Sequence, residues 1–396
     1  MGKRKPALRF KGFEEDWDTF RLEDLVQIIM GQSPDGSTYS ETPSDYILVQ
    51  GNADLKNGWV TPRIWTTQVT KKASAGDLIM SVRAPAGTIG KTAYDVVLGR
   101  GVAAIKGNEF LYQNLVKMES DGYWRKLFSG STFESLNSND INNAELFVSS
   151  NTEQMRIGNF FNQLDTLITQ QQRKYDSLLN VKKSMLEKMF PKDGADVPEI
   201  RFKGFSGAWE QSQFGDMVDS YQDPIPTPHN GYTRLGIRSH AKGTFHSYVE
   251  RGRELETAQM HRVAAGNFIV NITFGWEHAV AITEENDAGK LVSHRFPQFR
   301  FRDGLNPEFF KYVIIDEKFR HHLWLASPGG AGRNRVLKIN EMLEYKMVFP
   351  SEDEQGKIAN YFKNLDSLIT LHHQKLDHLK HIKSALLEKM FVPEAA

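Results

Sequence analysis

The chain repeats itself, and this duplication limits its possible architecture more than any other feature of the sequence. The segment Pro6–Trp17 recurs as Pro198–Trp209, 192 residues later, with 7 of 12 positions identical. Residues 153–190 recur as 354–391, 201 residues later, with 19 of 38 positions identical. Between these markers the two halves share little. Repeats of this length are domain-sized and too long for a solenoid, so we expect two unlike globular blocks built on one repeated framework.

The second marker has the heptad spacing of a long helix in both copies. Its apolar positions alternate in steps of four and three, and one position is polar in each copy. We predict a helix-pairing seam formed by Ile157, Phe161, Leu164, Ile168, Gln171, Tyr175 and Leu178, and in the second copy by Ile358, Phe362, Leu365, Ile369, His372, Leu376 and Leu379. The polar pair Gln171 and His372 would fix the register.

The ends of these helices are also marked in the sequence. Ser150 with Glu153, and Ser351 with Glu354, have the spacing of capping boxes, and a proline follows each marker. A helix of 38 residues is about 57 Å long, too long to be buried within one small domain. We expect the two helices to pair with each other in antiparallel fashion. The alternative, two surface helices that each pack on their own domain, stays open.

Composition excludes several classes of protein. The 396 residues include no cysteine, which rules out a disulfide scaffold and a cysteine-ligated zinc site. No apolar run approaches the ~18 residues of a membrane span, and the first residues lack the apolar core of a secretory signal, so we expect a cytoplasmic protein. Lys and Arg number 49 and so do Asp and Glu. Any DNA binding must therefore come from local cationic patches.

The two variable blocks are predicted to be mixed α and β. Residues 46–49, 77–82, 267–272 and 296–301 are predicted strands, and residues near 108–128 and 306–325 are predicted helices. Cationic and amide side chains on loops are those that hold phosphates or read base edges. The DNA-binding candidates are Gln32, Ser33, Arg63, Lys71, Lys72, Arg83, Lys91, Arg100, Ser129 and Ser131 in the first block, and Arg234, Arg238, Lys242, Arg251, Arg253, Arg333, Asn334 and Arg335 in the second.

Motifs for catalysis are weak. Residues 85–92 resemble a phosphate loop, but Pro85 stands at the first glycine and has no N–H to donate. Residues 306–309 are not the methyltransferase motif Asn-Pro-Pro-aromatic, and residues 344–346 have only the spacing of a nuclease carboxylate–lysine pair. The histidines between 372 and 381 lack the arrangement of a metal site. We expect no catalytic residue, no metal site and no cofactor in this chain.

The whole chain resembles the specificity subunits of type I restriction-modification enzymes. The resemblance rests on the repeated plan, the two openings Pro-x-(Leu/Ile)-Arg-Phe-Lys-Gly-Phe-(x)3-Trp, and the shared Leu-Asp-(Thr/Ser)-Leu-Ile-Thr of the helices. Gly31–Pro34 and Gly87–Thr92 also look typical of such proteins, whereas the second block has Phe274–His278 in place of the latter.

This resemblance implies an α+β fold with a pseudo-two-fold internal repeat. Two mixed α/β target recognition domains, residues 1–150 and 192–350, would be joined by two spacer helices, residues 151–191 and 351–393, that form an antiparallel coiled coil. Each domain would read one half of a split, asymmetric double-stranded DNA target, while the helices set the gap and dock two modification subunits.

The same resemblance assigns the chemistry to other chains. The modification subunits would bind S-adenosylmethionine and methylate adenine, and motor/restriction subunits would use ATP and Mg²⁺. The alternative is a coiled-coil adaptor or scaffold protein that binds no DNA. The sequence leaves open the bases recognised, the gap length, the loops that contact bases, the subunit-docking residues, and whether the system cuts DNA or only methylates it.

Overall fold

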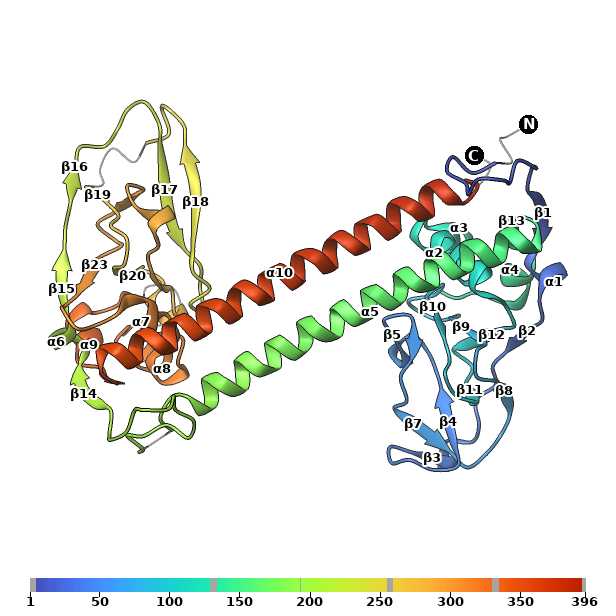
Figure 1. Ribbon diagram of the computed structural model, residues 1–396, viewed down its shortest axis with the longest axis horizontal. Coiled ribbons are helices and arrows are strands. Elements are labelled where there is room, and N and C mark those ends of the chain that lie inside the picture. The colour runs from blue at the N-terminus through green and yellow to red at the C-terminus, as the bar shows by residue number, and fades with distance from the viewer. Residues whose placement is uncertain (1–4, 129–133, 193, 255–258, 330–334, 394–396) are drawn as a thin grey trace. The chain divides into compact units, whose positions relative to one another are not determined.

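The computed structural model describes residues 5–128, 134–192, 194–254, 259–329 and 335–393. It has two compact units: unit 1 comprises Met1–Tyr175 and Leu371–Ala396, and unit 2 comprises Asp176–Thr370. The long helices α5 (Asn151–Lys188) and α10 (Glu352–Met390) each contribute one part to each unit (Figure 1). The units cut across the four predicted segments because each globular head packs on the start of one long helix and the end of the other.

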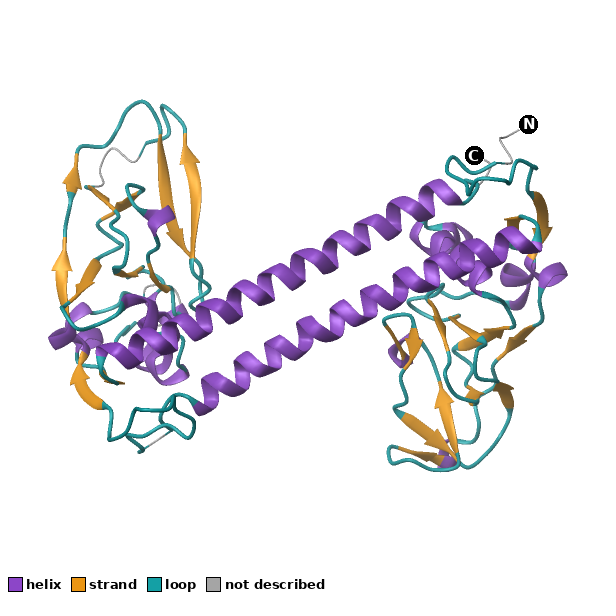
Figure 2. Ribbon diagram, in the orientation of Figure 1, coloured by secondary structure: helices purple, strands orange, loops and turns teal. Residues whose placement is uncertain are grey.

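The head of unit 1 contains sheets in the orders β1-β13, β2-β12-β9-β10-β6-β5 and β3-β7-β4-β11-β8. Figure 2 shows strands in orange and helices in purple. Its strands are β1 (Asp18–Arg21), β2 (Ile28–Met30), β3 (Tyr39–Ser40), β4 (Tyr46–Val49), β5 (Leu55–Lys56), β6 (Trp59–Val60), β7 (Ile64–Thr66), β8 (Lys71–Ala73), β9 (Leu78–Ser81), β10 (Ile89–Lys91), β11 (Val96–Leu98), β12 (Val102–Ile105) and β13 (Glu145–Val148). Its helices are α1 (Leu22–Leu25), η1 (Gly36–Thr38), η2 (Asn52–Asp54), α2 (Glu109–Ser120), α3 (Tyr123–Leu127) and α4 (Ser138–Asn142).

The head of unit 2 contains sheets in the orders β14-β24, β15-β23-β20-β21 and β16-β19-β22-β17-β18. Its strands are β14 (Glu210–Gln213), β15 (Val218–Tyr221), β16 (Pro224–Ile225), β17 (Tyr232–Ile237), β18 (Thr244–Val249), β19 (Met260–Arg262), β20 (Phe268–Val270), β21 (Val280–Ile282), β22 (Leu291–Ser293), β23 (Gln298–Phe301) and β24 (Lys346–Phe349). Its helices are α6 (Phe214–Met217), η3 (Gly275–Glu277), η4 (Glu285–Asp287), α7 (Pro307–Val313), α8 (Glu317–Leu325) and α9 (Ile339–Leu343).

The predicted strands are confirmed as parts of β4, β9, β20 and β23. Strand β9 and strand β12, at the centre of the first head, are buried along their whole length, and apart from Ser81 all their residues are apolar. Each predicted helix of the blocks is divided in two. The first is interrupted at Gly122, whose positive φ of 75° ends the α-helical path before α3.

The repeated markers build the same scaffold in each unit. Strand β1 pairs with β13 so that Asp18 faces Val148, and β14 pairs with β24 so that Glu210 faces Phe349. Asp18 and Glu210 are 192 residues apart, and Val148 and Phe349 are 201 residues apart. These are the two repeat offsets that the sequence shows. The duplicated residues therefore specify where each long helix leaves its head.

The two long helices pair in antiparallel fashion within each unit, which confirms the predicted coiled coil. In unit 1, Lys383 Nζ lies 2.6 Å from Asp165 Oδ1. In unit 2 the repeat equivalents Lys182 and Asp366 form the corresponding ion pair. Each aspartate also accepts a hydrogen bond from its head, from Gln113 in unit 1 and from Tyr312 in unit 2. One aspartate per unit thus joins a head to both helices.

Every predicted seam residue is buried or half-buried. The first seam positions pack into the heads: Ile157 and Phe161 join a cluster with Trp17 and Phe391, and Phe362 joins the core of unit 2. Further along, the Gln171 Nε2 amide contacts the ring of His372 and donates to its carbonyl oxygen at 3.1 Å. These two residues occupy the same position in the two repeats, so the predicted polar pair meets within unit 1.

A buried ion pair attaches each opening segment to its long helix. Arg9 donates from Nε and Nη2 to the two carboxylate oxygens of Glu153, at 2.6 and 2.7 Å, and Glu153 is fully buried. Arg201 makes the same two bonds to Glu354, both at 2.7 Å. We call these two pairs the clamps. Bidentate pairing of this kind fixes distance and orientation together.

The clamps replace the reciprocal capping boxes that the sequence predicts. Ser150 Oγ accepts the backbone N–H of Glu153 at 3.4 Å, which is one half of a capping box. The Glu153 carboxylate does not return to Ser150, because it is occupied by Arg9 and by the indole N–H of Trp17 at 3.2 Å. The prediction located the helix start correctly and assigned the glutamate to the wrong partner.

One backbone hydrogen bond joins the opening segment of unit 1 to the end of α10, and unit 2 forms the equivalent bond within one continuous segment. The backbone N–H of Leu8 donates to Lys389 O at 2.7 Å, and the repeat-equivalent bond in unit 2 joins Ile200 to Lys188 at 2.9 Å. In unit 2 these two residues belong to one continuous segment that begins at the last residue of α5. Among the described residues, no helix has the length and apolar character needed to cross a membrane.

Candidate nucleic-acid interface

Four predicted residues of the first block meet on one loop system. Gln32 and Ser33 follow β2, where Gln32 N–H donates to Leu98 O at 2.9 Å. Ser33 Oγ accepts the backbone N–H of Arg100 at 3.1 Å. Thr70, which precedes Lys71, donates to Gln32 O at 2.5 Å. The structure thus gathers Gln32, Ser33, Lys71 and Arg100 at one site, which we call the 32/100 cluster.

The 32/100 cluster has the chemistry of a base-reading or phosphate-holding site. The side chains of Lys71 and Arg100 are exposed, and among the described residues neither forms an ion pair. Lys72, the next residue of β8, lies over the ring of Tyr46 with its Nζ 4.9 Å from the ring centre. Backbone hydrogen bonds hold the loops in place, so two free cations and one amide project from a fixed frame.

Arg63 is a weaker candidate, because it neutralises a buried group of the protein. Its Nε lies 2.8 Å from Oδ1 of Asp54, a carboxylate that is only 2% exposed. Asp54 also accepts the backbone N–H groups of Gln50 and Gly51. Arg83 is exposed, and its backbone forms an isolated antiparallel β-bridge with Ser135. Ser129 and Ser131 lie outside the described residues.

Lys91 does not fit its predicted role. Its side chain is buried, with Nζ 2.8 Å from Glu109 Oε2 and within 5 Å of the ring centres of Trp59 and Tyr112. A cation enclosed by a carboxylate and two rings is a structural ion pair rather than a surface charge. The phosphate-loop-like motif around it forms part of the turn after β9 and strand β10 itself.

The second block divides its cations between the two ends of the hairpin β17–β18. Arg238 and Lys242 belong to the tip, where the Arg238 guanidinium lies 5.3 Å from the ring centre of Phe245. Arg251 and Arg253 are exposed in the segment that follows β18. A six-residue strand spans about 20 Å. The structure therefore does not bring these four residues together.

Arg234 and Arg335 have different surroundings. Arg234 projects from the middle of β17, is exposed, and forms no ion pair among the described residues. The Arg335 guanidinium lies 4.6 Å from the ring centre of Trp324. Arg333 and Asn334, predicted with it, lie outside the described residues.

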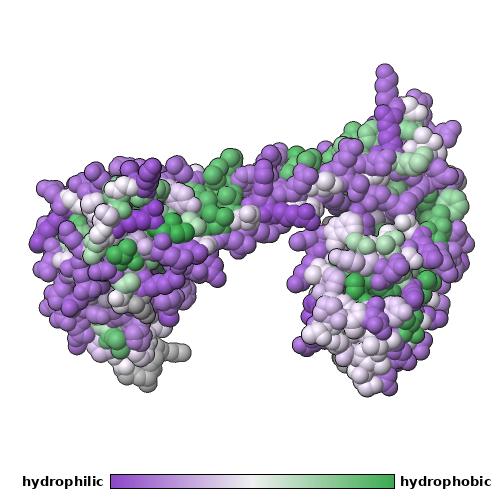
Figure 3. All heavy atoms as spheres, turned by 60° about the horizontal axis from the view of Figure 1, so that its bottom comes forward, coloured by the Kyte–Doolittle hydropathy of each residue, from purple (hydrophilic) through white to green (hydrophobic). Residues whose placement is uncertain are grey.

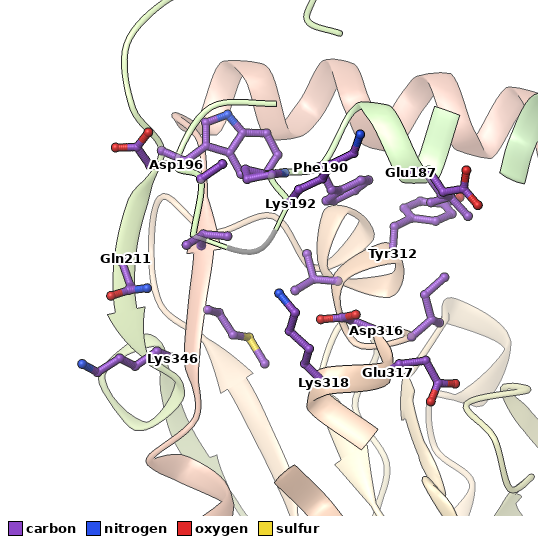
Figure 4. A pocket seen from close by; sticks show the side chains of 18 of the residues that line it. Glu187, Phe190, Lys192, Asp196, Gln211, Tyr312, Asp316, Glu317, Lys318 and Lys346 are labelled. Carbon is purple, nitrogen blue, oxygen red and sulfur yellow. The ribbon is translucent and has the colours of Figure 1, made fainter. Parts of the chain in front are cut away.

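A large groove of unit 2 contains none of the predicted DNA-binding residues. This groove of about 1560 Å³ lies between the end of α5, with Phe190 and Lys192, and the start of α8, with Asp316 and Lys318 (Figure 4). Its lining mixes lysines with similar numbers of carboxylates, so it offers no net attraction to phosphate.

Helix α7 ends at Val313, whereas its counterpart α2 continues to Ser120 and packs Val116 on the core.

Buried titratable groups near the heads support structure. Burial lowers the pKa of His278, and the neutral ring donates from Nε2 to Ile314 O at 2.7 Å. Burial, with the nearby carboxylate of Asp165, raises the pKa of the Tyr112 phenol. Among the described residues no group of three or more His, Asp or Glu side chains could hold a metal ion.

The clamps were missed by the sequence analysis, although a signal was present. Arg9 and Arg201 are identical positions of the first marker, and Glu153 and Glu354 are identical positions of the second. An arginine and a glutamate retained in both copies could have been paired with each other. Heptad spacing and caps are properties of the helix alone, so they do not indicate a partner outside it.

Comparison with known proteins gives consistent matches across the chain. The family described as "Type I restriction modification DNA specificity domain" matches residues 14–180 and again residues 209–381. The putative type I restriction enzyme MjaX specificity subunit of Methanocaldococcus jannaschii is 28% identical over 182 residues, which cover 43% of this chain and 42% of that protein. The type I restriction enzyme MjaVIII specificity subunit of the same organism is 19% identical, over 94% of this chain and 91% of that protein.

Solved structures show the same fold. The crystal structure of a type I restriction-modification S subunit from M. genitalium has a TM-score of 0.67 at 13% identity, covering 99% of this chain and all of that one. A chain from a structure titled for complex assembly and conformational transition of the type I R-M system has a TM-score of 0.50 at 14% identity, covering 96% of this chain and 98% of that one. The predicted α+β fold is confirmed.

Proposed function

This chain belongs to the family of type I restriction modification DNA specificity domains, with one such domain in each half, and we propose that it is the DNA-recognition subunit of a type I restriction-modification complex. Each unit reads one half of a bipartite, asymmetric target in double-stranded DNA. The adaptor alternative is not favoured, because both halves of the chain match a family named for DNA specificity.

One observation carries the proposal: the two heads repeat a framework and differ in what they project from it. Both contain the β1–β13 type of sheet and a parallel strand pair, β4 with β11 and β17 with β22. Among the residues that the structure describes, only the first inserts β5 and β6, and only the second has the six-residue hairpin β17–β18. Two domains with the same framework and different loops are suited to recognise two different half-sites.

The chemistry is assigned to partner subunits. We propose that this chain is not an enzyme, and that S-adenosylmethionine, ATP and Mg²⁺ are bound by the modification and motor subunits with which it assembles in the cytoplasm. The purified chain is expected to show no methyl transfer with S-adenosylmethionine and no DNA cleavage with Mg²⁺. Activity of the chain alone would contradict this assignment.

The function is tested by selection from a pool of random duplexes in the presence of the cognate modification subunits. A split sequence with two specified halves and an unspecified gap should be enriched. Methylation mapping of a host genome with and without this chain should return the same sequence. If neither experiment gives a split sequence, the result contradicts the proposal and favours the adaptor alternative.

Arg100 is predicted to contribute to the first half-site. Arg100→Ala should weaken specific binding by ~1–3 kcal/mol and relax recognition at one base pair, because a bidentate arginine–guanine contact has about that value. Binding of variant duplexes, measured by fluorescence anisotropy, checks this. Arg21→Ala, which removes an exposed arginine 57% accessible to solvent, is the matched control and should leave the half-site unchanged.

The long helices are predicted to set the gap between the half-sites. They are the two covalent connections between the units, so inserting one turn, four residues, into both should lengthen the unread gap while each half-site stays the same. The readout is the same duplex selection. An unchanged gap would remove the helices from this role.

A further inference from the structure

A second cavity of unit 2 has the form of a small ligand site. It measures about 350 Å³, near the lower limit of small-molecule pockets, and lies between the hairpin β17–β18 and the loop that connects β20 to β21. Its aromatic side chains are Phe245, Phe274 and Phe296, and Phe245 and Phe274 are 40% and 45% exposed. Exposed rings beside a cavity leave apolar surface that a flat ligand can cover.

The loop of this cavity is one of the segments in which the two halves of the chain differ. Residues 274–278 occupy the connection between β20 and β21, as residues 85–88 occupy the connection between β9 and β10. In unit 1, a side chain on Gly87 would meet the Trp124 ring at 2.7 Å, so that loop is packed against its own head. In unit 2, Phe274 and Glu277 instead line the cavity.

The cavity is held in shape by contacts between the hairpin tip and the loop. The backbone N–H groups of His240 and Ala241 donate to Glu277 O and His278 O, at 2.9 and 2.8 Å. Ser239 Oγ donates to Glu277 Oε2 at 2.6 Å. His240, Ala241 and His278 all have positive φ, which fits a conformation fixed by these bonds. A ligand would therefore meet a formed site.

A glycine in the hairpin leaves space for the Phe245 ring, one of the aromatic side chains that line the cavity. Gly236 faces Phe245 across β17 and β18, and a Cβ on Gly236 would lie 2.3 Å from the Phe245 ring. The ring thus lies directly over the glycine backbone, and the Arg238 guanidinium lies 5.3 Å from its centre. These contacts fix the orientation of the ring.

The polar groups of the cavity define what it can bind. Glu277 Oε2 accepts from Ser239, and among the described residues no hydrogen bond reaches Oε1. The Asn271 side-chain carbonyl accepts the N–H of Thr273, and its amide donor is unused among the same residues. One acceptor and one donor beside aromatic walls match the edge and faces of a nucleobase. The carboxylate disfavours phosphate, whereas Arg234 at the lining suits a phosphate outside it.

We propose that this cavity receives a single nucleobase, taken from the stack of the bound duplex, between Phe245, Phe274 and Phe296. The inference rests on the proposed DNA-recognition function and adds an unstacking step to one half-site. Glu277 requires a hydrogen-bond donor: adenine, cytosine and guanine offer an amino group, and thymine offers its N3–H. A free nucleotide presents the same chemistry and is the second source to be tested.

The test uses the complex of this chain with its modification subunits and the selected duplex. Single abasic sites are placed in turn along the second half-site, and affinities of the wild-type chain and of Phe274→Ala are compared. On intact DNA, Phe274→Ala should weaken binding about 5- to 150-fold, the value of one stacked base. At one abasic position this ratio should fall to about 1, because the base that Phe274 holds is absent.

Two further variants separate the role of the cavity from loss of folding. Tyr248→Ala removes a 66% exposed ring from β18 of the same hairpin and should give the same ratio at every position. Glu277→Gln keeps the size of the side chain and replaces an acceptor, so it should change the base preferred at that one position. Circular dichroism and a normal first half-site verify that each variant is folded.

The possible results are distinct. Specific binding in which no abasic position lowers the Phe274→Ala ratio overturns the inference and leaves the proposed function intact. Absence of specific duplex binding by the wild-type complex overturns both. Saturable binding of adenosine, cytidine, guanosine or thymidine monophosphate to the wild-type chain, lost in Phe274→Ala and without a special abasic position, assigns the cavity to free nucleotides and overturns the duplex source.

Discussion

Replacing Arg9 with methionine is expected to destabilise unit 1 by about 3–5 kcal/mol, the usual cost of removing one partner of a buried ion pair. The Glu153 side chain is fully buried, at 0% exposed, and the Arg9 side chain is only 13% exposed. Without Arg9 the carboxylate keeps the Trp17 indole as a donor and loses its countercharge. Chemical denaturation and hydrogen exchange at α5 measure the loss.

A double-mutant cycle identifies the cause. Arg9→Met with Glu153→Leu removes both charges and should recover much of the stability lost by Arg9→Met, because no unpaired charge remains buried. Lys5→Met is the matched control: its ion pair with Asp16 is 3.4 Å long and more than half exposed, so its loss should cost less than about 1 kcal/mol. If Arg9→Met proves as mild as Lys5→Met, the clamp does not hold the opening segment to the helix.

Replacing Leu167 or Leu368 with aspartate is expected to remove one bound modification subunit each. A single exposed leucine is ordinary on a protein surface, but these two are 52% and 45% exposed and occupy the same position of the two repeats. Figure 3 shows apolar patches on the surface of the long helices. A repeated apolar position suits two identical partners. An aspartate there should weaken docking by about 2–4 kcal/mol, roughly 30- to 1000-fold.

The stoichiometry of the complex, measured by light scattering, checks this docking prediction. The wild-type chain should bind two modification subunits, each single variant one, and the double variant none. Asn162→Asp introduces the same charge on α5, about 140° around the helix from Leu167, and should leave both partners bound. Two bound partners on the double variant would place the docking surface elsewhere.

The framework of this protein was predictable because it is governed by local patterns that appear twice. Heptad spacing gave the seam and, with the serines and prolines, the ends of both long helices to within a few residues. Even the meeting of Gln171 with His372 followed from the repeat. Periodicity is a property of a single segment, so one sequence contains it.

The DNA-binding candidates were less predictable, since their value depends on what folding places beside them. Lys91 and Arg100 are both basic residues near glycines, yet Lys91 is enclosed by Glu109, Trp59 and Tyr112 while Arg100 stays exposed beside Ser33. Their surroundings come from segments distant in the chain. Charge alone does not separate a structural cation from one that is available to a ligand.

The sequence by itself determined a duplicated chain with two long pairing helices and two unlike heads, because repeats and heptads are local and linear. Only the tertiary structure decided that Arg9 and Arg201 bind the helix-start glutamates, and that Phe274 and Glu277 line a cavity beneath the hairpin tip. Those contacts join residues 38 to 153 positions apart, as in Ser239 with Glu277 and Arg201 with Glu354. Such pairings depend on how chain segments pack in three dimensions, which no local pattern encodes.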